Sequence, residues 1–125
     1  MSIEFVVPRG MARPASNYSH AAIVSGGRLV LLSGQVGAGA DGAVPEDFAE
    51  QCRFAWRNVE TALKAAGAGL SSIARVNAFI VRRADTATFR EIRDATLPHS
   101  PASTVVIAEL LDPRWLVEIE VTAVV

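Results

Sequence analysis

The last segment of the chain, Trp115–Val125, alternates between two kinds of side chain, the pattern of a β-strand whose faces meet different environments. One face is wholly apolar and is expected to face the core; it carries Trp115, Val117, Ile119, Val121 and Ala123. The other face mixes carboxylates with apolar groups; it carries Leu116, Glu118, Glu120, Thr122 and Val124. This second face is too apolar for open water and too charged for a sealed core. A subunit interface that contains a wet cleft would satisfy both demands.

Two short apolar runs nearer the start of the chain predict a β-hairpin. Ala21–Ser25 and Arg28–Gly34 are separated by Gly26-Gly27, and a glycine pair between two apolar runs is a strong turn signal. Residues 1–20 are expected to form an irregular arm or a short edge strand. Residues 36–44 contain three glycines and are expected to form a flexible loop.

The middle of the chain predicts two helices, each followed by a strand. Pro45 opens the clearer helix, because proline suits a first helical turn, and Gly67 ends it as a cap. Apolar residues recur along it at steps of three and four: Phe48, Cys52, Ala55, Val59, Ala62, Leu63 and Ala66. A shorter helix is expected over Asp85–Leu97. Strands are expected over Ile73–Val81 and Ser103–Leu110.

The resulting order is β-β-α-β-α-β-β, which predicts an α+β fold with one mixed sheet and two helices on one of its faces. The sequence contains no repeat, no low-complexity tract and no linker long enough to separate domains. We therefore expect a single domain over residues 1–125.

Charge and cysteine content exclude several classes of protein. Twelve basic residues against 13 acidic ones give a net charge of −1, so we expect no nucleic-acid partner. The single cysteine, Cys52, excludes an internal disulfide and a cysteine-based zinc site, and is expected to be inert core. His20 and His99 are too few for a metal site, and no cofactor is expected. With no secretory signal and no apolar run of about 20 residues, we expect a soluble cytoplasmic domain without a membrane partner.

Six segments form an ordered set along the chain: Tyr18-Ser19-His20-Ala21, Leu31-Leu32-Ser33-Gly34-Gln35, the helical stretch Asn58–Gly67, Val76-Asn77-Ala78-Phe79-Ile80, His99-Ser100-Pro101-Ala102 and Val117-Glu118-Ile119-Glu120. In this order, the set resembles the signatures of the RidA/YjgF family, also called Rid or L-PSP endoribonuclease-like proteins. The resemblance implies a chorismate-mutase-like α+β fold. It also implies a homotrimer whose sheets face inward and whose three inter-subunit clefts bind a small molecule. The best-known family activity is hydrolysis of reactive enamines and imines, such as 2-aminoacrylate, to a ketoacid and ammonia.

One position departs from the pattern of these relatives. They grip the substrate carboxylate with an arginine in a Pro-x-Arg-Ser/Thr segment, whereas this chain reads Pro101-Ala102-Ser103-Thr104. A hydroxyl at Ser103 offers one neutral donor where a guanidinium offers two charge-assisted bonds. We therefore expect an altered substrate and weak or no activity on 2-aminoacrylate. The family often has asparagine where this chain has Arg93, which could supply the missing cation, although a solvated helix arginine is the simpler expectation.

The resemblance implies that Glu118 is the acidic residue of the cleft, which makes it the candidate catalytic residue. Hydrolysis of a C=N bond needs a positioned water and a group that moves a proton. Its alternative role is an interface carboxylate bound to a neighbouring chain. Glu120 lies on the same face, but a short strand on a small sheet offers no sugar groove, so a glycosidase pair is disfavoured. The candidate substrate-binding residues are Tyr18, Ser33, Gly34, Arg93, Ser103 and Thr104.

Two functions remain open from the sequence. The first is a trimeric hydrolase or deaminase of a small enamine, imine or related metabolite. The second is a non-catalytic trimer that binds a small molecule or acts as a chaperone-like partner. A nuclease, suggested by the older family name, is disfavoured because the chain is neutral and lacks a basic-aromatic array.

Overall fold

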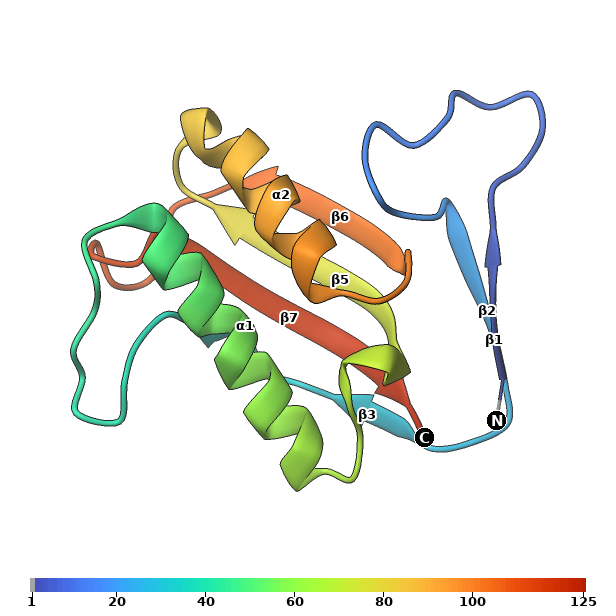
Figure 1. Cartoon of the computed structure of the whole chain (residues 1–125), viewed down its shortest axis with the longest axis horizontal. Helices are drawn as coiled ribbons and strands as arrows, with labels where there is room; N and C mark the ends of the chain where they lie inside the picture. Colours follow the sequence, from blue (N-terminus) through green and yellow to red (C-terminus); the bar gives the residue numbers. More distant parts are fainter. Residues whose placement is uncertain (1) are drawn as a thin grey trace.

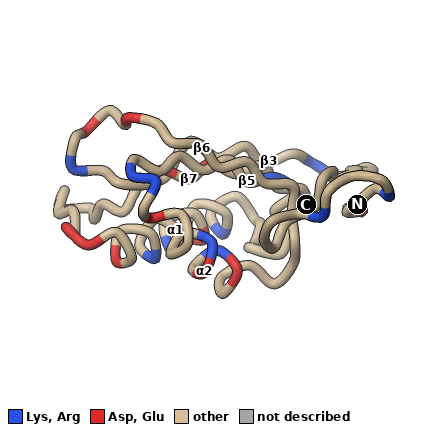
Figure 2. Tube along the Cα trace, turned by 90° about the horizontal axis from the view of Figure 1, so that it is seen from above, with Lys and Arg blue, Asp and Glu red and all other residues tan. Residues whose placement is uncertain are grey.

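Five strands form one mixed sheet, and both helices cover the same face of it (Figures 1 and 2). The computed structural model describes residues 2–125. The strands of this sheet are β3 (Leu29–Leu31), β4 (Gln35–Val36), β5 (Ile73–Ile80), β6 (Ala102–Ile107) and β7 (Val117–Val124). β7 is central, with β3 and β4 along one side and β5 along the other, and β6 follows β5. Only β5 and β6 run parallel; the other pairs are antiparallel.

The α+β fold class and the two helices on one face are confirmed, but the prediction that every strand joins one sheet is wrong. β1 (Ser2–Val6) and β2 (Ala21–Ser25) pair antiparallel in a separate two-stranded sheet. Figure 1 shows this pair standing beside the main sheet, joined at its top by the loop of residues 7–20. We call residues 7–20 the arm. The expected irregular arm therefore exists, preceded by a short strand.

The predicted hairpin between the two glycine-separated runs is also wrong. Gly26 and Gly27 do turn the chain, with φ of +70° and +83°, which glycine adopts without steric cost. Directly after the turn, however, Arg28 and Val125 exchange two backbone hydrogen bonds of 2.7 and 3.0 Å. These bonds place β3 against β7 instead of β2. A glycine pair thus identifies a turn, whereas the partner of the following strand depends on the far end of the chain.

Helix α1 spans Phe48–Ala65 and begins three residues later than Pro45. Asp47 is its N-cap, because the Asp47 carboxylate accepts a hydrogen bond from the backbone N–H of Glu50 at 3.1 Å. The expected stop is confirmed: Gly67 follows the helix with φ of +78°. The buried face of α1 contains Trp56 and Cys52, and burial raises the pKa of the Cys52 thiol to about 12. Cys52 is thus an inert core residue, as predicted.

The second helix and the remaining strands agree with their predicted ranges. α2 spans Thr86–Thr96, preceded by a short 3-10 turn over Arg83–Asp85 (η2), and another such turn, η1 (Leu70–Ser72), leads into β5. β6 ends at Ile107, three residues before the predicted end. Along β7 the odd-numbered residues are buried against the helices, while Glu118, Glu120 and Thr122 are half-buried on the opposite face. No helix among residues 2–125 is both long and apolar enough to cross a membrane.

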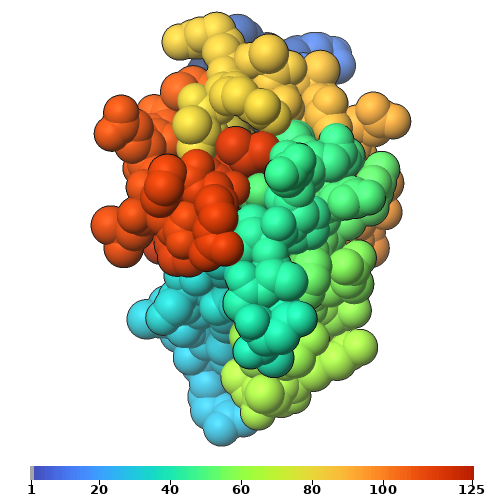
Figure 3. All heavy atoms as spheres, turned by 90° about the vertical axis from the view of Figure 1, so that its left-hand side faces the viewer, coloured from blue at the N-terminus to red at the C-terminus, as the bar shows by residue number. Residues whose placement is uncertain are grey.

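Gln51 fixes the start of α1 to the loop between β6 and β7. Its side chain is fully buried, and its amide nitrogen donates to the carbonyl oxygens of Pro45 and Arg114 at 2.7 and 2.9 Å. Its amide oxygen accepts from the backbone N–H of Leu116 at 2.9 Å. Figure 3 shows this end of the molecule, where the loop packs beside the start of the helix. One buried side chain therefore pairs with three backbone groups, from the segment before α1 and from the segment before β7.

We predict that Gln51→Leu, which keeps the volume and removes all three bonds, lowers the free energy of unfolding by about 2–4 kcal/mol. Urea unfolding followed by circular dichroism measures this loss. The control is Glu50→Gln at the adjacent exposed position, which is expected to cost less than about 1 kcal/mol. Equal losses in both variants would contradict the role given to Gln51.

Candidate functional site

The face of the sheet that the helices leave uncovered carries a row of polar side chains across three strands; we call it the outer face. Glu120 of β7 is paired with Asn77 of β5, which is paired with Thr104 of β6. The Asn77 amide donates to a Glu120 carboxylate oxygen at 3.0 Å. The Arg75 Nε in turn donates to the Asn77 amide oxygen at 3.2 Å. These bonds fix the amide orientation of Asn77 and hold Glu120 in place.

Glu118 lies two residues before Glu120 on β7, on the same face of the sheet, against the junction of β3 and β4. Leu31 pairs with Thr122 and Gln35 pairs with Ile119, so the β3–β4 side has one residue more than β7. Ser33 and Gly34 form this irregular junction. The Glu118 carboxylate packs so closely on Gly34 that a Cβ there would overlap it. The structure thus places Gly34, next to Ser33 in the chain, against the Glu118 side chain.

Large apolar side chains surround these polar groups on the outer face. Leu29 and Leu31 of β3 are 64% and 72% exposed, and Val106 of β6 is 42% exposed. Leu31 shares its face with Thr122 through their register, and Val106 shares its face with Phe79. Apolar side chains of this size are costly to leave in water. The mixed character predicted for this face is therefore present in the folded chain.

The other candidate residues gather around Arg93 of α2, at the base of the arm. The Arg93 side chain is only 2% exposed, and its Nη2 donates to the Ser16 hydroxyl at 2.7 Å. Its Nη1 lies 3.3 Å from the Ser103 hydroxyl, and its Nε donates to the Asp94 carboxylate at 3.1 Å. Tyr18, two residues beyond Ser16, is half-buried, and its hydroxyl accepts from the backbone N–H of Ala15 at 3.4 Å.

Two sequence-based expectations need correction here. Arg93 is not a solvated helix arginine, because the arm, β6 and Asp94 enclose its guanidinium. Ser103 and Thr104 do not line one wall together, since adjacent strand residues point to opposite faces. Ser103 pairs with the buried Val76 on the helix side, whereas Thr104 pairs with Asn77 on the outer face.

The candidate residues therefore form two groups. Ser33, Gly34, Glu118 and Thr104 belong to the outer face, and Tyr18, Arg93 and Ser103 belong to the base of the arm. Sequence reasoning missed Ser16, which accepts a hydrogen bond from the candidate Arg93, and Asn77, which donates to Glu120 on the same face as Glu118. The register of β5 against β7 could have suggested Asn77, because it faces Glu120. Nothing in the sequence indicated Ser16, which lies 77 positions from its partner.

Comparison with known proteins finds a matching family model and proteins of similar sequence. The family model described as Endoribonuclease L-PSP matches residues 10–125. The chain is 35% identical over 74 residues to the RutC family protein YjgH of Escherichia coli, covering 59% of this chain and 56% of YjgH. It is 35% identical over 88 residues to the mitochondrial protein mmf2 of Schizosaccharomyces pombe, covering 70% of this chain and 69% of mmf2. The matched stretch thus spans little more than half of YjgH.

The fold is similar to that of solved structures over its full length. The crystal structure of YyfB from Yersinia pestis, a Rid-family protein of unknown function, superposes with a TM-score of 0.88. The two sequences are 27% identical, and the match covers all of both chains. The β1–β2 pair and the arm therefore lie within the region that the match covers.

We predict that Gly34→Ala displaces the Glu118 carboxylate and lowers the free energy of unfolding by roughly 1–3 kcal/mol, because the added Cβ overlaps that side chain. The matched control is Gly69→Ala. Gly69 has a φ of −143° and open space around its Cβ position, so the change is expected to stay within about 0.5 kcal/mol. Thermal unfolding of both variants measures the difference. If Gly34→Ala leaves the free energy of unfolding unchanged, the Glu118 side chain does not pack against this junction.

Proposed function

We propose that this chain, which belongs to the RidA/YjgF family, is a cytoplasmic hydrolase or deaminase of a small enamine, imine or related metabolite. Its clefts lie between the copies of a homotrimer, and Glu118 moves the proton. The observation that carries the proposal is the Glu118 carboxylate, held against Gly34 on a sheet face that no helix covers. An acid so placed is half-buried, and a substrate can still reach it.

The chemistry needs one group that takes up and returns a proton. Water adds across the C=N bond of an imine: its oxygen bonds to carbon while Glu118 accepts a proton. Glu118 returns that proton to the nitrogen, which gives a carbinolamine. Glu118 then takes the hydroxyl proton of the carbinolamine and passes it to the nitrogen as the C–N bond breaks, and the products are a carbonyl compound and ammonia. An enamine becomes an imine first, by accepting a proton at its terminal carbon and losing one from its nitrogen. Glu120 is engaged with Asn77, so Glu118 is the carboxylate available for this work.

The apolar part of the outer face supports the trimer. Leu29, Leu31 and Val106 are too exposed to stabilise the single chain, whereas sister chains would bury them. Glu118 and Glu120 lie among these apolar residues. The contact between sister chains would therefore exclude most of the solvent from the outer face and leave a cleft around the two carboxylates. The hydroxyl of Ser33 stands exposed beside that cleft and is available to orient water or ligand.

We predict that Leu31→Asp converts the trimer to monomers, because it places a charge in the apolar contact. Size-exclusion chromatography with light scattering measures the mass. The matched control is Leu111→Asp: Leu111 is 96% exposed in the loop after β6, so the trimer is expected to survive. A Leu31→Asp protein that remains trimeric would place the interface elsewhere.

We predict that Glu118→Gln abolishes release of ammonia from a panel of small imines generated in solution, while the trimer remains intact. Glu109→Gln, which changes an exposed carboxylate outside the main sheet, is expected to leave the rate unchanged. Full activity of Glu118→Gln would remove the mechanism. Saturable ligand binding by the wild-type trimer without any product would favour the non-catalytic alternative instead.

A further inference from the structure

The neighbours of Glu118 across the sheet are apolar. Phe79 of β5 pairs with Glu118 of β7, and Val106 of β6 pairs with Phe79, so the three side chains lie in one line on the outer face. Phe79 is half-buried, and Val106 is 42% exposed. A substrate whose reacting carbon lies at Glu118 therefore places its substituent against an aromatic ring and a valine.

The next line of side chains is polar, and its members bind one another. Glu120 accepts from the Asn77 amide at 3.0 Å, and the Asn77 amide oxygen accepts from the Arg75 Nε at 3.2 Å. Arg75 is the only cation among the residues of the five strands. Its backbone lies four residues from that of Phe79, about 13 Å along β5. The bond to Asn77 thus keeps the Arg75 side chain on the Glu120 side of the face, away from Glu118.

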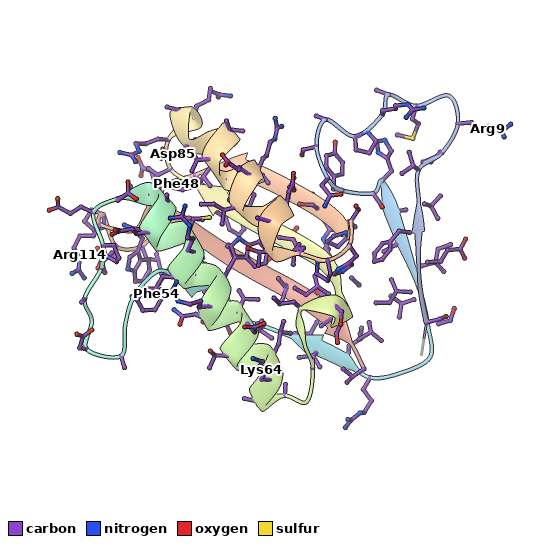
Figure 4. The ribbon with its side chains drawn as sticks, in the orientation of Figure 1. Arg9, Phe48, Phe54, Lys64, Asp85 and Arg114 are labelled. Atoms are coloured by element: carbon purple, nitrogen blue, oxygen red, sulfur yellow. The ribbon has the colours of Figure 1, made fainter. Side chains whose placement is uncertain are left out.

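Two further cations that lie near the ends of these strands are held by their own chain. Arg114, in the loop before β7, binds both carboxylate oxygens of Asp112 at 2.8 and 3.2 Å, and Figure 4 shows it at the edge of the molecule. Arg93 is 2% exposed and is enclosed by the bonds described above. Neither Glu118 nor Glu120 forms an ion pair with any of residues 2–125.

The two carboxylates therefore give this part of the outer face a negative potential. Glu118 and Glu120 are two residues apart, about 7 Å along β7. Coverage by sister chains would exclude water and so strengthen every charge interaction in the cleft. A protonated imine carries a positive charge and is attracted to this potential. A carboxylate on the reacting carbon of the substrate would instead lie beside Glu118 and be repelled by it.

We propose that the substrate of this chain is the imine of a primary amine that carries an aromatic or other apolar substituent and no carboxylate. The inference rests on the proposed function, because it names the substrate class of the same Glu118 site. Phe79 and Val106 contact the substituent, and the two carboxylates stabilise the charge of the protonated imine.

This substrate class implies the reaction that supplies it. Oxidation of R–CH2–NH2 by dioxygen removes two electrons and two protons, and gives the imine R–CH=NH and hydrogen peroxide. Addition of water to the imine then gives the aldehyde R–CHO and ammonia. The chain would thus act directly after an amine oxidation.

The test compares two imines that differ only in a carboxylate. Flavin-dependent oxidases, with dioxygen as oxidant, form one imine from 2-phenylethylamine and the other from L-phenylalanine. The initial rate of ammonia release above the uncatalysed rate is expected to be at least about 10-fold higher for the imine without the carboxylate. Equal rates, or a higher rate for the imine with the carboxylate, would overturn the proposal.

Variants at Phe79 test the contact with the substituent. Phe79→Ala is expected to lower kcat/KM for the phenylethylamine imine by about 10-fold or more, and to leave the small imine formed from ethylamine within about 3-fold. Phe79→Leu is expected to recover most of the loss, because it restores an apolar contact. The matched control is Phe54→Ala: Phe54 lies on α1, as Figure 4 shows, beside Gly39, and its loss is expected to change neither rate. An equal loss for both imines in Phe79→Ala would contradict the specificity role of Phe79.

A binding measurement separates the substrate class from the mechanism. If no imine is turned over, the proposed hydrolysis is wrong, and calorimetry with 2-phenylethylamine and L-phenylalanine still tests the inference. The amine is expected to bind at least about 10-fold more tightly than the amino acid, and less tightly to Phe79→Ala. Equal or tighter binding of phenylalanine would overturn the inference. Equal hydrolysis of both imines, lost in Glu118→Gln, would refute only the substrate class and leave the proposed function standing.

Discussion

A β-sheet has two faces, and in this chain the helices cover only one of them. β7 is flanked by strands on both sides, so its alternating residues decide what each face contains. The buried series from Val117 to Ala123 packs against α1, and the intervening carboxylates necessarily point the other way. The placement of Glu118, the exposed leucines of β3 and the polar row through Asn77 all depend on that single alternation.

The parts of the fold that depend on local pattern could be predicted from the sequence. The apolar periodicity of α1 and the alternation of β7 located both elements, because each reports which side of a segment is buried. Which strand pairs with which could not be predicted in this way, because strand pairing depends on residues that are far apart in the sequence. Gly26-Gly27 predicted a turn, and a turn is present, but the bonds between Arg28 and Val125 determine that β3 joins β7. Those residues lie far apart in the sequence, and no local signal connects them.

The same limit explains what was missed in the candidate site. The sequence showed that position 103 holds serine and that α2 contains Arg93, but not that their side chains meet. It gave no indication that Ser16 completes the group, because that contact joins the arm to a helix 77 positions away. Strand parity could have separated Ser103 from Thr104, since neighbouring residues of a strand face opposite ways. Glu118 and Gly34 were singled out because both lie in short segments that resemble family signatures, and the structure places the two residues in contact.

The account as a whole requires that the outer face of the sheet be covered by copies of the same chain. Without that contact, Leu29 and Leu31 stay in water and Glu118 has no cleft. The most direct measurement is sedimentation equilibrium of the unmodified protein over a range of concentrations. The account predicts the mass of three chains at every concentration at which the protein is active. An active protein with the mass of one chain would contradict it.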